Sequence, residues 1–503
     1  MHKGKQRVAQ RVAQRVAQRG AQGGAQRFVK RFTQRFTHLA LPAALMVLCG
    51  CSFIPAYQRP APPVASQWPQ PAKPAGERQV AGISWQQMLP DPRLQALIEA
   101  ALEHNRDLRI AVARVAEARA LYGITRADRL PTLNVSASEA AARTPADLSI
   151  TRQEATGRRY DVALGMTAFE FDFWGRVKSL SESARASYLA TEEARAAFRL
   201  GLIADVATAY LTLQENEERL ALTRATVESR KESRDLIQRR RDVGLAGDLD
   251  FLAADGAYEA ARGELANLER SRAAAENALT LLVGKEPLNL PAGRRLTEQG
   301  IVIDLIAEVP SEALLSRPDV RAAEQKLVAA NANIGAARAA FLPRVGLSLA
   351  FGTASASLSG LFDSGSRAWS FVPNIVQPLF DAGRTQAGVD LAEARKNVAV
   401  AEYERTIQQA FREVADLLVA RDTLATQLKA QEAAEQAQNA RLRLVDARYR
   451  AGASSYLEVL DAQRDAFAAQ QGTVQVRRAL LATGAQLYKA LGGGQETGNG
   501  RTA

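Results

Sequence analysis

The sequence predicts an α+β membrane protein, in which three chains with four strands each form a twelve-stranded β-barrel continued by a long α-helical coiled-coil barrel. Three observations carry this prediction. The chain contains an internal two-fold duplication, each half has two segments with an alternating apolar pattern, and each half has one very long stretch almost free of glycine and proline.

The duplication is visible by direct comparison. Residues 107–136 match residues 319–348 at an offset of 212 without a gap, and FDFWGR at 171–176 matches FDAGR at 380–384 at an offset of 208. We therefore expect a first structural repeat at 91–283 and a second at 311–491, joined by a linker at 284–310 that forms a belt around the helices. The period is far too long for a solenoid, so a whole half was duplicated.

The N-terminal region has the pattern of a secretory signal, expected at 1–50. The 503-residue chain has a net charge of +11, and ten Lys and Arg with no Asp or Glu lie in the first fifty residues, which leaves +1 for the rest. An apolar run, Leu39–Leu48, follows and is too short to span a bilayer. The small net charge that remains in the mature chain gives no reason to expect a nucleic acid partner.

The sequence LCGCS at 48–52 resembles the lipobox of bacterial lipoproteins. The resemblance implies cleavage before Cys51, a covalent lipid on that cysteine and sorting to the outer membrane; the alternative is an ordinary signal peptide with incidental cysteines. Residues 51–90 are proline-rich at first and are expected to form a lipidated tether, whereas residues 492–503 are expected to be a disordered tail.

Strands are expected where the apolar period changes to two. The four segments begin near Leu133, Tyr160, Val345 and Trp369, and apolar residues alternate in them with small or polar ones. This pattern is typical of a barrel wall between lipid and water, although a soluble, half-buried sheet has the same alternation. Four strands cannot close a barrel, and open strand edges are not tolerated in lipid, so a membrane barrel requires an oligomer, and a homotrimer would have twelve strands.

The helices are expected in three classes. Lys178–Val243 and Arg384–Arg448 predict two helices of nearly 100 Å each, at about 1.5 Å per residue. Shorter helices are expected to enter the strands at 94–129 and 311–341 and to return from the far ends at 248–283 and 456–490. Stacked end to end, two short helices match one long helix, so each chain would supply four columns to a helical tube.

Enzymatic chemistry has few candidate residues in the mature chain. Cys51 would be its one cysteine and His104 its one histidine, which excludes an intrachain disulfide, a Cys/His zinc cluster and a Cys–His nucleophile pair. No nucleotide-binding loop or nucleophile elbow occurs. We therefore expect no enzyme, no metal site and no cofactor apart from the covalent lipid.

The far helical turns contain the candidate functional residues. Gly244 and Gly452 interrupt the long helices at equivalent positions, and glycine accepts the positive φ of such a turn. Glu458 and Asp461 lie three residues apart on one helix face, and three copies of them would form a carboxylate ring that favours cations. The alternative is that acids near a helix start simply complement its dipole.

Several further motifs follow one another along the chain: CSFIPAYQRPAPP, DPRLQALIEAALEHNRDLRIA, FDFWGR, VGLAGDLD, PLFDAGR and RYRAG followed by YLEVLDAQR. In this order they resemble the outer-membrane efflux factors of the TolC type, in particular the lipoprotein branch paired with resistance–nodulation–division pumps. The resemblance implies a trimeric exit duct in the outer membrane with a long periplasmic extension, which receives small molecules from an inner-membrane pump through a periplasmic adaptor.

The resemblance also implies a periplasmic gate at the helical tips. Asp250 aligns with an acid of the first hairpin and Tyr449 with a tyrosine of the second, so a hydrogen bond between them is the expected latch; Ser454 stands where some members carry an arginine. The turns Val243–Leu245 and Ala451–Ala453, with Gly244, Leu245, Gly452 and Ala453, are the expected adaptor-docking surface. The alternative function is a lipid-anchored periplasmic coiled-coil scaffold without a pore. Drugs, metal ions and solvents all stay open as cargo.

Overall fold

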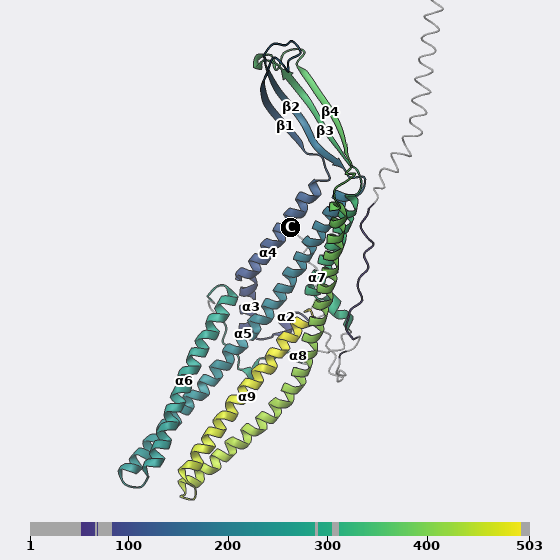
Figure 1. Ribbon diagram of the computed structural model, residues 1–503. Helices are drawn as coiled ribbons and strands as arrows, with labels where there is room; N and C mark the ends of the chain where they lie inside the picture. Colours follow the sequence, from purple (N-terminus) through teal and green to yellow (C-terminus); the bar gives the residue numbers. More distant parts are fainter. Residues whose placement is uncertain (1–51, 66–67, 69–82, 287–289, 304–310, 494–503) are drawn as a thin grey trace, which may run out of the picture. The chain divides into compact units, whose positions relative to one another are not determined.

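The computed structural model describes residues 52–65, 68, 83–286, 290–303 and 311–493 (Figure 1). The expected signal peptide, the lipidation site Cys51 and the expected disordered tail after Gly493 lie outside these residues. The chain divides into two compact units. The first contains the β-sheet with residues 124–183 and 331–393, and the second contains most of the helical residues.

The sheet has four antiparallel strands in the order β1-β2-β3-β4. They are β1 (Leu133–Thr144), β2 (Ala155–Phe171), β3 (Arg344–Ser355) and β4 (Arg367–Val376). A bulge between Met166 and Phe169 shifts the register of β2 against β3, and Ala168 there has a φ of 51°. Pro373 lies on β4, which is an edge strand and therefore tolerates proline.

One face of the sheet is apolar across all four strands. Val135 pairs with Leu164, Leu164 with Phe351, and Phe351 with Trp369. Their exposures are 77%, 51%, 66% and 76%, so nothing in the described chain covers this row. The adjacent row on the opposite face consists of small and polar residues: Asn134, Gly165, Ala350 and Ser370.

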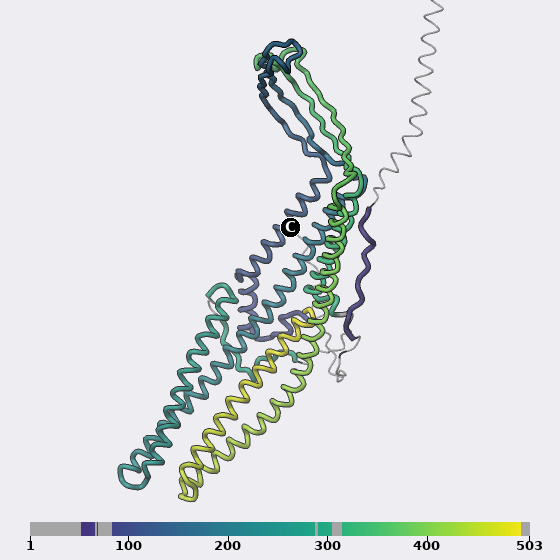
Figure 2. Tube along the Cα trace, viewed as in Figure 1, coloured from purple at the N-terminus to yellow at the C-terminus, as the bar shows by residue number. Residues whose placement is uncertain are grey.

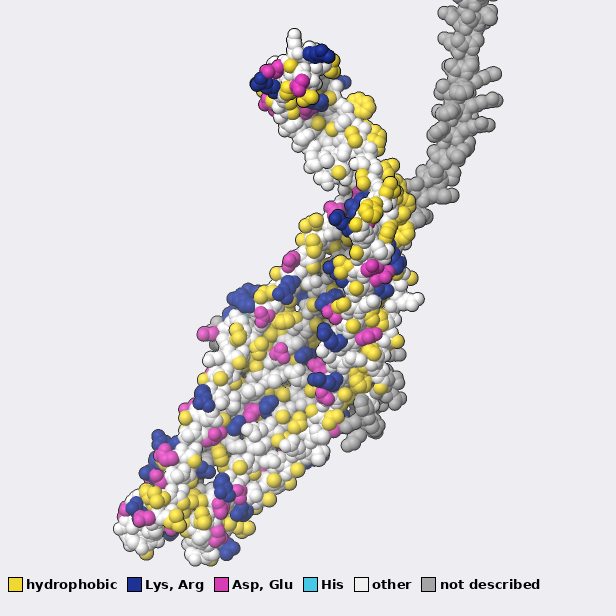
Figure 3. Space-filling view, in the orientation of Figure 1, with side chains coloured by type: hydrophobic (Ala, Val, Ile, Leu, Met, Phe, Trp, Pro, Cys, Tyr) yellow, Lys and Arg dark blue, Asp and Glu magenta, His cyan; other side chains and the backbone are white. Residues whose placement is uncertain are grey.

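Charged side chains gather at the loop end of the sheet, while the strands themselves show mainly apolar and small residues (Figure 3). Arg143 pairs with Glu154 and Arg159 with Asp161 near the β1–β2 connection. Charge near the strand ends and uncharged middle segments, such as 162–169 of β2 and 345–355 of β3, are the pattern of a sheet that crosses an apolar layer.

The two long helices are present as expected. Helices α5 (Arg176–Asp242) and α8 (Arg384–Arg450) have 67 residues each. One window of α5 is long and apolar enough to cross a membrane by composition, and 44% of it is buried inside the protein, so this window is weak evidence for a membrane span. The returning helices, α6 (Asp248–Val283) and α9 (Tyr456–Ala490), have the expected bounds and run back along α5 and α8 (Figures 1 and 2).

The prediction of a single helix over 94–129 was wrong. The structure has α3 (Pro92–His104) and α4 (Arg106–Ala127), separated at Asn105, after a short α2 (Trp85–Met88). The second repeat is interrupted at the equivalent place: a 3-10 turn, η3 (Ser311–Ser316), precedes α7 (Pro318–Ala339), with Arg317 between them. The interruption at Arg317 follows from Pro318, which disfavours a helical conformation in the residue before it.

These interruptions position the side chains that join the short helices end to end. The Asn105 Nδ2 donates to the carbonyl of Leu282 near the end of α6, 2.8 Å away, while its Oδ1 accepts from the backbone N–H of Leu108. Arg317 donates to the carbonyl of Ala490, the last residue of α9. Asn105 and Arg317 are equivalent in the duplication, as are Leu282 and Ala490, so the expected end-to-end stacking is confirmed in both repeats.

The main core lies where the stacked helices and the linker meet. Tyr210 of α5, Tyr403 of α8 and Leu296 of the 3-10 turn η2 (Leu296–Glu298) are almost fully buried. The Tyr210 hydroxyl donates to Asp91, the N-cap of α3, at 2.7 Å. The Leu296 N–H donates to Glu218 at 2.6 Å, so the described part of the linker is fixed on α5. A second, smaller apolar cluster lies at the far ends of the hairpins.

Candidate functional site

Both hairpin tips turn at the predicted glycines. Gly244 has a φ of 75° and Gly452 a φ of 71°. At each tip the glycine and the next residue, Leu245 or Ala453, donate backbone hydrogen bonds to carbonyls three and five residues earlier. This is a Schellman motif, which satisfies the last carbonyls of the long helix and requires the left-handed conformation at the glycine.

Replacing Gly452 by alanine is expected to destabilise the tip by about 1–2 kcal/mol, because a side chain is strained at this positive φ. Gly256 is a matched control, since it lies exposed inside α6 with open space around it. Gly256→Ala is expected to stabilise the helix by up to about 1 kcal/mol. Thermal unfolding followed by helical circular dichroism measures both changes, and equal shifts of the same sign would contradict this interpretation.

The two hairpins are joined at their tips by an arginine and a tyrosine. The Arg240 Nη1 of α5 donates to the hydroxyl of Tyr449 on α8, 2.7 Å away. The Arg240 guanidinium carbon also lies 5.4 Å from the centroid of the Tyr449 ring. A charged donor and a cation–π contact therefore act on the same tyrosine.

A small apolar cluster supports this contact. Ile237 and Ala254 of the first hairpin pack with Tyr456 and Val459 of the second, and Tyr449 lies against them. Burial raises the pKa of Tyr456 to about 12, and the neighbouring Tyr449 adds to the shift. The Tyr456 phenol therefore stays neutral at physiological pH, so the cluster contains no buried charge.

The hydrogen bond expected between Asp250 and Tyr449 is not formed among the described contacts of this chain, in which the Tyr449 hydroxyl accepts a hydrogen bond from Arg240. Asp250 lies near Tyr456, whose pKa its negative charge helps to raise. The neighbouring Asp248 pairs with Arg241 at 2.7 Å, and Arg241 also lies over the Phe251 ring. Whether Asp250 reaches Tyr449 of another chain stays a prediction.

Glu458 has a local role at the start of α9. It closes a capping box with Ser455, in which the Glu458 carboxylate accepts from the Ser455 N–H at 3.3 Å. The Ser454 hydroxyl donates to the same carboxylate at 3.2 Å, and these donors lower the pKa of Glu458, the Ser455 N–H most strongly. Asp461 pairs with Arg464 on its own helix at 3.3 Å. Glu458 is exposed and Asp461 is partly exposed. A carboxylate ring in an oligomer stays a prediction.

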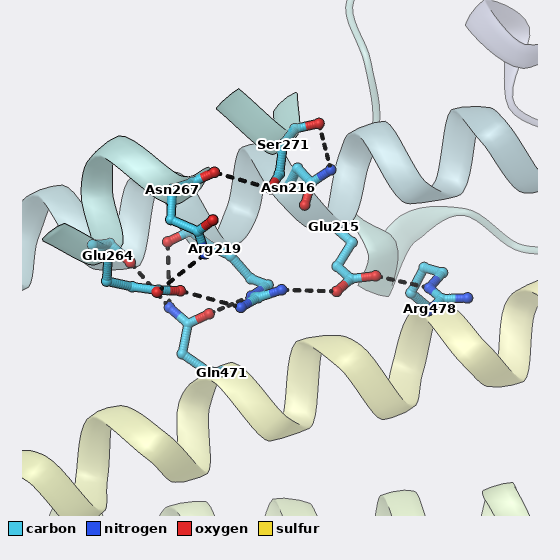
Figure 4. A network of polar contacts seen from close by, with 9 residues as sticks. Glu215, Asn216, Arg219, Glu264, Asn267, Ser271, Gln471 and Arg478 are labelled. Carbon is cyan, nitrogen blue, oxygen red and sulfur yellow. Dashed lines mark hydrogen bonds and ion pairs between the residues drawn. The ribbon is translucent and has the colours of Figure 1, made fainter. Parts of the chain in front are cut away.

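A second connection between the hairpins lies far from the tips (Figure 4). Arg219 of α5 bonds Gln471 of α9 at 2.5 Å and approaches Glu264 of α6 at 3.5 Å. Glu215, one helical turn before Arg219, pairs with Arg478 of α9 at 2.8 Å. Glu215 and Gln471 are 6% and 8% exposed, so this network joins α5, α6 and α9 through largely desolvated groups.

Between the tip contact and this network the hairpins leave a groove. One pocket of about 390 Å³ and a neighbouring one of about 300 Å³ share Ser229, Leu442 and Gln463. The Gln463 Oε1 and the Arg230 Nε are buried in the described structure without a hydrogen-bond partner. Burial lowers the pKa of the Arg230 guanidinium. The groove thus combines apolar side chains with charged and polar ones, and two of its polar atoms lack partners within the described chain, as a docking surface for another helix would.

Arg240 stands out in the sequence only as the middle of a run of arginines. Arg239–Arg241 are three consecutive arginines at the end of α5, a placement that the helix dipole alone already explains. The duplication aligns Tyr449 with Arg241, so comparing the two halves could not reveal the contact with Arg240. Among the described residues, no group of three or more His, Cys, Asp or Glu side chains is placed to hold a metal ion.

Comparison with known proteins identifies one family. The family model described as outer membrane efflux protein matches residues 97–285 and 309–493, which correspond to the two repeats. The chain is 45% identical over 461 residues to outer membrane protein OprJ of Pseudomonas aeruginosa, covering 90% of this chain and 95% of that protein. It is also 45% identical over 457 residues to the solvent efflux pump outer membrane protein SrpC of Pseudomonas putida, covering 90% and 97%.

Solved structures agree with this similarity. The open state of the MtrE outer membrane channel of Neisseria gonorrhoeae superposes with a TM-score of 0.81 at 38% identity, covering 88% of this chain and 98% of that channel. A membrane protein from Pseudomonas aeruginosa gives a TM-score of 0.82 at 44% identity over 88% of this chain and all of that one.

Proposed function

Because the chain belongs to the outer membrane efflux protein family, and is thus an outer-membrane channel component of an efflux system, we propose that it acts as a passive trimeric duct with a gate at its helical tips. The family consists of transport channels rather than enzymes. In this proposal the energy for transport comes from a partner pump, and the chain supplies a path across the outer membrane and part of the periplasm.

The observation that supports the trimer most strongly is the open sheet. Its apolar face is exposed, and its edge strands β1 and β4 have no neighbour in the described chain. Lipid can cover the apolar face, but unpaired edges in lipid leave backbone groups without hydrogen bonds. Pairing β4 of one chain with β1 of the next satisfies both edges, and three copies of this four-stranded sheet give twelve strands.

The scaffold alternative requires the apolar face to be covered by protein. The row from Val135 to Trp369 is instead half to three-quarters exposed in this chain. A lipid-facing sheet therefore accounts for the row better than a soluble sheet does.

We propose that the gate is held by the contacts between the hairpins. The Arg240–Tyr449 contact holds the tips, and the Glu215–Arg219–Gln471 network fixes the hairpins farther along. Release of the tip contact alone would let the tips separate while the network keeps the helices together. Asp250, Glu458 and Asp461 are proposed to line the passage and to favour cations.

The partners proposed for the duct are a periplasmic adaptor and an inner-membrane pump of the resistance–nodulation–division type. The groove between the hairpins and the turns at Gly244–Leu245 and Gly452–Ala453 offer the adaptor a surface close to the gate. SrpC is named for solvent efflux. For this chain we propose only that small molecules selected by the pump pass through the duct, and that Cys51 carries the lipid anchor.

A charge on the apolar face tests the membrane barrel. Phe371 lies on that face of β4 and is 57% exposed, whereas the adjacent Ser370 points to the opposite face. Phe371→Arg is expected to destabilise the inserted barrel by about 2–4 kcal/mol per chain near mid-membrane, and Ser370→Arg by much less. Heat-resistant trimers in isolated outer membranes are the readout. Equal trimer yields from both variants would contradict a lipid-facing sheet.

A further inference from the structure

The described residues that follow Cys51 are bound along α7. We define the strap as residues 52–59. The Arg59 Nε and Nη2 donate to the two carboxylate oxygens of Glu324 on α7, at 2.7 and 2.9 Å. The Tyr57 hydroxyl donates to the same carboxylate at 3.1 Å. The N-terminal part of the expected tether is therefore fixed on a helix.

The strap supplies the partners of a buried charge. Glu324 is 8% exposed, and in the described structure its carboxylate is bonded by Arg59 and Tyr57. Among the described residues, the buried Tyr403 hydroxyl nearby has no hydrogen-bond partner, so it does not replace Arg59 and Tyr57. If the strap left α7, the Glu324 carboxylate would lose both of the partners that satisfy it in its buried position.

A second anchor lies farther along α7, toward the strands. The Asn331 Nδ2 donates to the carbonyl of Pro55 at 2.8 Å. A side chain at Gly335 would meet the Ile54 Cγ1 at 2.6 Å and the Ser179 Oγ at 2.7 Å. Gly335 is thus needed for the close approach of the strap. Glu324 contacts Tyr57 and Arg59, whereas Gly335, farther along α7, lies against the earlier residue Ile54. The strap therefore runs antiparallel to α7.

The duplication provides an internal comparison. At the offset of 212, Glu324, Asn331 and Gly335 correspond to Val112, Arg119 and Gly123 of α4. Val112 is 48% exposed, and a side chain at Gly123 would meet nothing within 4 Å. The binding features therefore belong to α7 alone and are not a general property of the repeated helix.

We propose that this face of α7 is a docking site for the chain's own N-terminal strap, and that the strap sets where the lipid on Cys51 enters the membrane. Cys51 is three residues before Ile54, a reach of at most about 11 Å along the chain. Ile54 contacts Gly335, four residues before the end of α7, and β3 begins at Arg344. The docked strap directs the lipid toward the beginning of the strands.

This inference rests on the proposed lipidation and the proposed barrel, and it adds a role for docking. A lipid on a free tether would leave the barrel at a variable distance from the membrane. A docked strap holds the acyl chains beside the strands that must insert. The strands are then kept close to the membrane surface, which raises its effective concentration and favours insertion. Docking, and not the lipid alone, is then needed for efficient insertion.

The test uses the full-length protein expressed in its normal outer membrane, with two independent kinds of variant. Arg59→Glu removes the ion pair and adds repulsion, and the double exchange Arg59→Glu with Glu324→Arg restores opposite charges. Gly335→Leu blocks the second anchor without any change of charge, and Gly123→Leu is its matched control. Incorporation of labelled palmitate and the yield of heat-resistant trimers are measured for each variant.

Docking predicts that trimer yield falls about tenfold or more in Arg59→Glu and Gly335→Leu while palmitate incorporation stays normal, which corresponds to a loss of at least about 1.4 kcal/mol. Gly123→Leu should keep the normal yield, and the double exchange should recover part of it. Normal yields from both Arg59→Glu and Gly335→Leu would overturn the docking role. Absence of trimers in the unaltered protein would instead overturn the proposed function.

Discussion

Replacing Arg317 by alanine is expected to lower the free energy of unfolding by about 1.5–3 kcal/mol, the range for hydrogen bonds to charged groups, because the two carboxylates that lose their partner are 39% and 33% exposed. The Arg317 side chain is 7% exposed and pairs with Asp319 at 2.8 Å and Glu413 at 2.9 Å. It also donates to the Ala490 carbonyl, which joins α9 to α7. The variant should therefore separate the stacked helices of the second repeat.

Thermal unfolding of the purified protein measures this loss, and Arg321→Ala is the control. Arg321 pairs with Glu193, but its side chain is 50% exposed, so its removal should cost about 1 kcal/mol or less. Similar unfolding midpoints for the two variants would contradict the role of Arg317 in joining the helices.

The ion pairs of Arg317 with Asp319 and Glu413 also predict that the stability of the protein depends on pH. Burial alone would raise the pKa of Asp319, but the hydrogen bonds and the charge of Arg317 lower it below its ordinary value. Since the folded state binds this proton less readily than the unfolded state, the contribution to stability is complete above the unfolded pKa of about 4. This contribution is lost as the pH falls through the lower pKa that Asp319 has in the folded protein. Asp319→Asn should flatten the dependence of the unfolding midpoint on pH in this acidic range.

Replacing Arg240 by alanine is expected to open the tips. The variant removes a hydrogen bond from a charged donor, typically worth about 1.5–3 kcal/mol, and a cation–π contact of about 0.5–1 kcal/mol at an exposed site. Even the lower figure would change the ratio of closed to open tips about tenfold. Tyr449→Phe keeps the ring and loses only the hydrogen bond, so its effect should be smaller.

Opening of the tips is measured in cells as increased sensitivity to a large hydrophilic antibiotic that an intact outer membrane excludes. Arg239→Ala is the control, since Arg239 is the exposed neighbour of Arg240 and carries the same charge. Sensitivity that rises equally in the Arg239 and Arg240 variants would indicate a general effect of charge and would contradict a specific latch.

The sequence predicted the regular elements because they repeat. The two long helices, the returning helices and the four strands each occur at equivalent places in both halves, and apolar spacing marks them. The interruption at Asn105 was missed because asparagine is compatible with a helix and no proline follows it. The interruption is associated with a tertiary contact, since the Asn105 side chain donates a hydrogen bond to the carbonyl of Leu282, 177 residues away.

The candidate site was predicted less completely. Gly244 and Gly452 could be identified because positive φ favours one residue type. The Arg240–Tyr449 contact joins helices 209 residues apart, and no local pattern encodes such a pairing. Glu458 shows the opposite case, because Ser455 followed three residues later by Glu458 is a capping-box pattern that was visible in the sequence.

The central claim is that three chains form a duct held shut at its tips, and single-channel conductance in a planar bilayer tests it most directly. The purified protein is compared with its Arg240→Ala, Tyr449→Phe and Asp250→Ala variants. A duct predicts a small, cation-selective conductance for the unaltered protein and a larger one for Arg240→Ala. If none of the four folded proteins conducts, the sheet does not form a membrane barrel, and the chain is a lipid-anchored periplasmic scaffold.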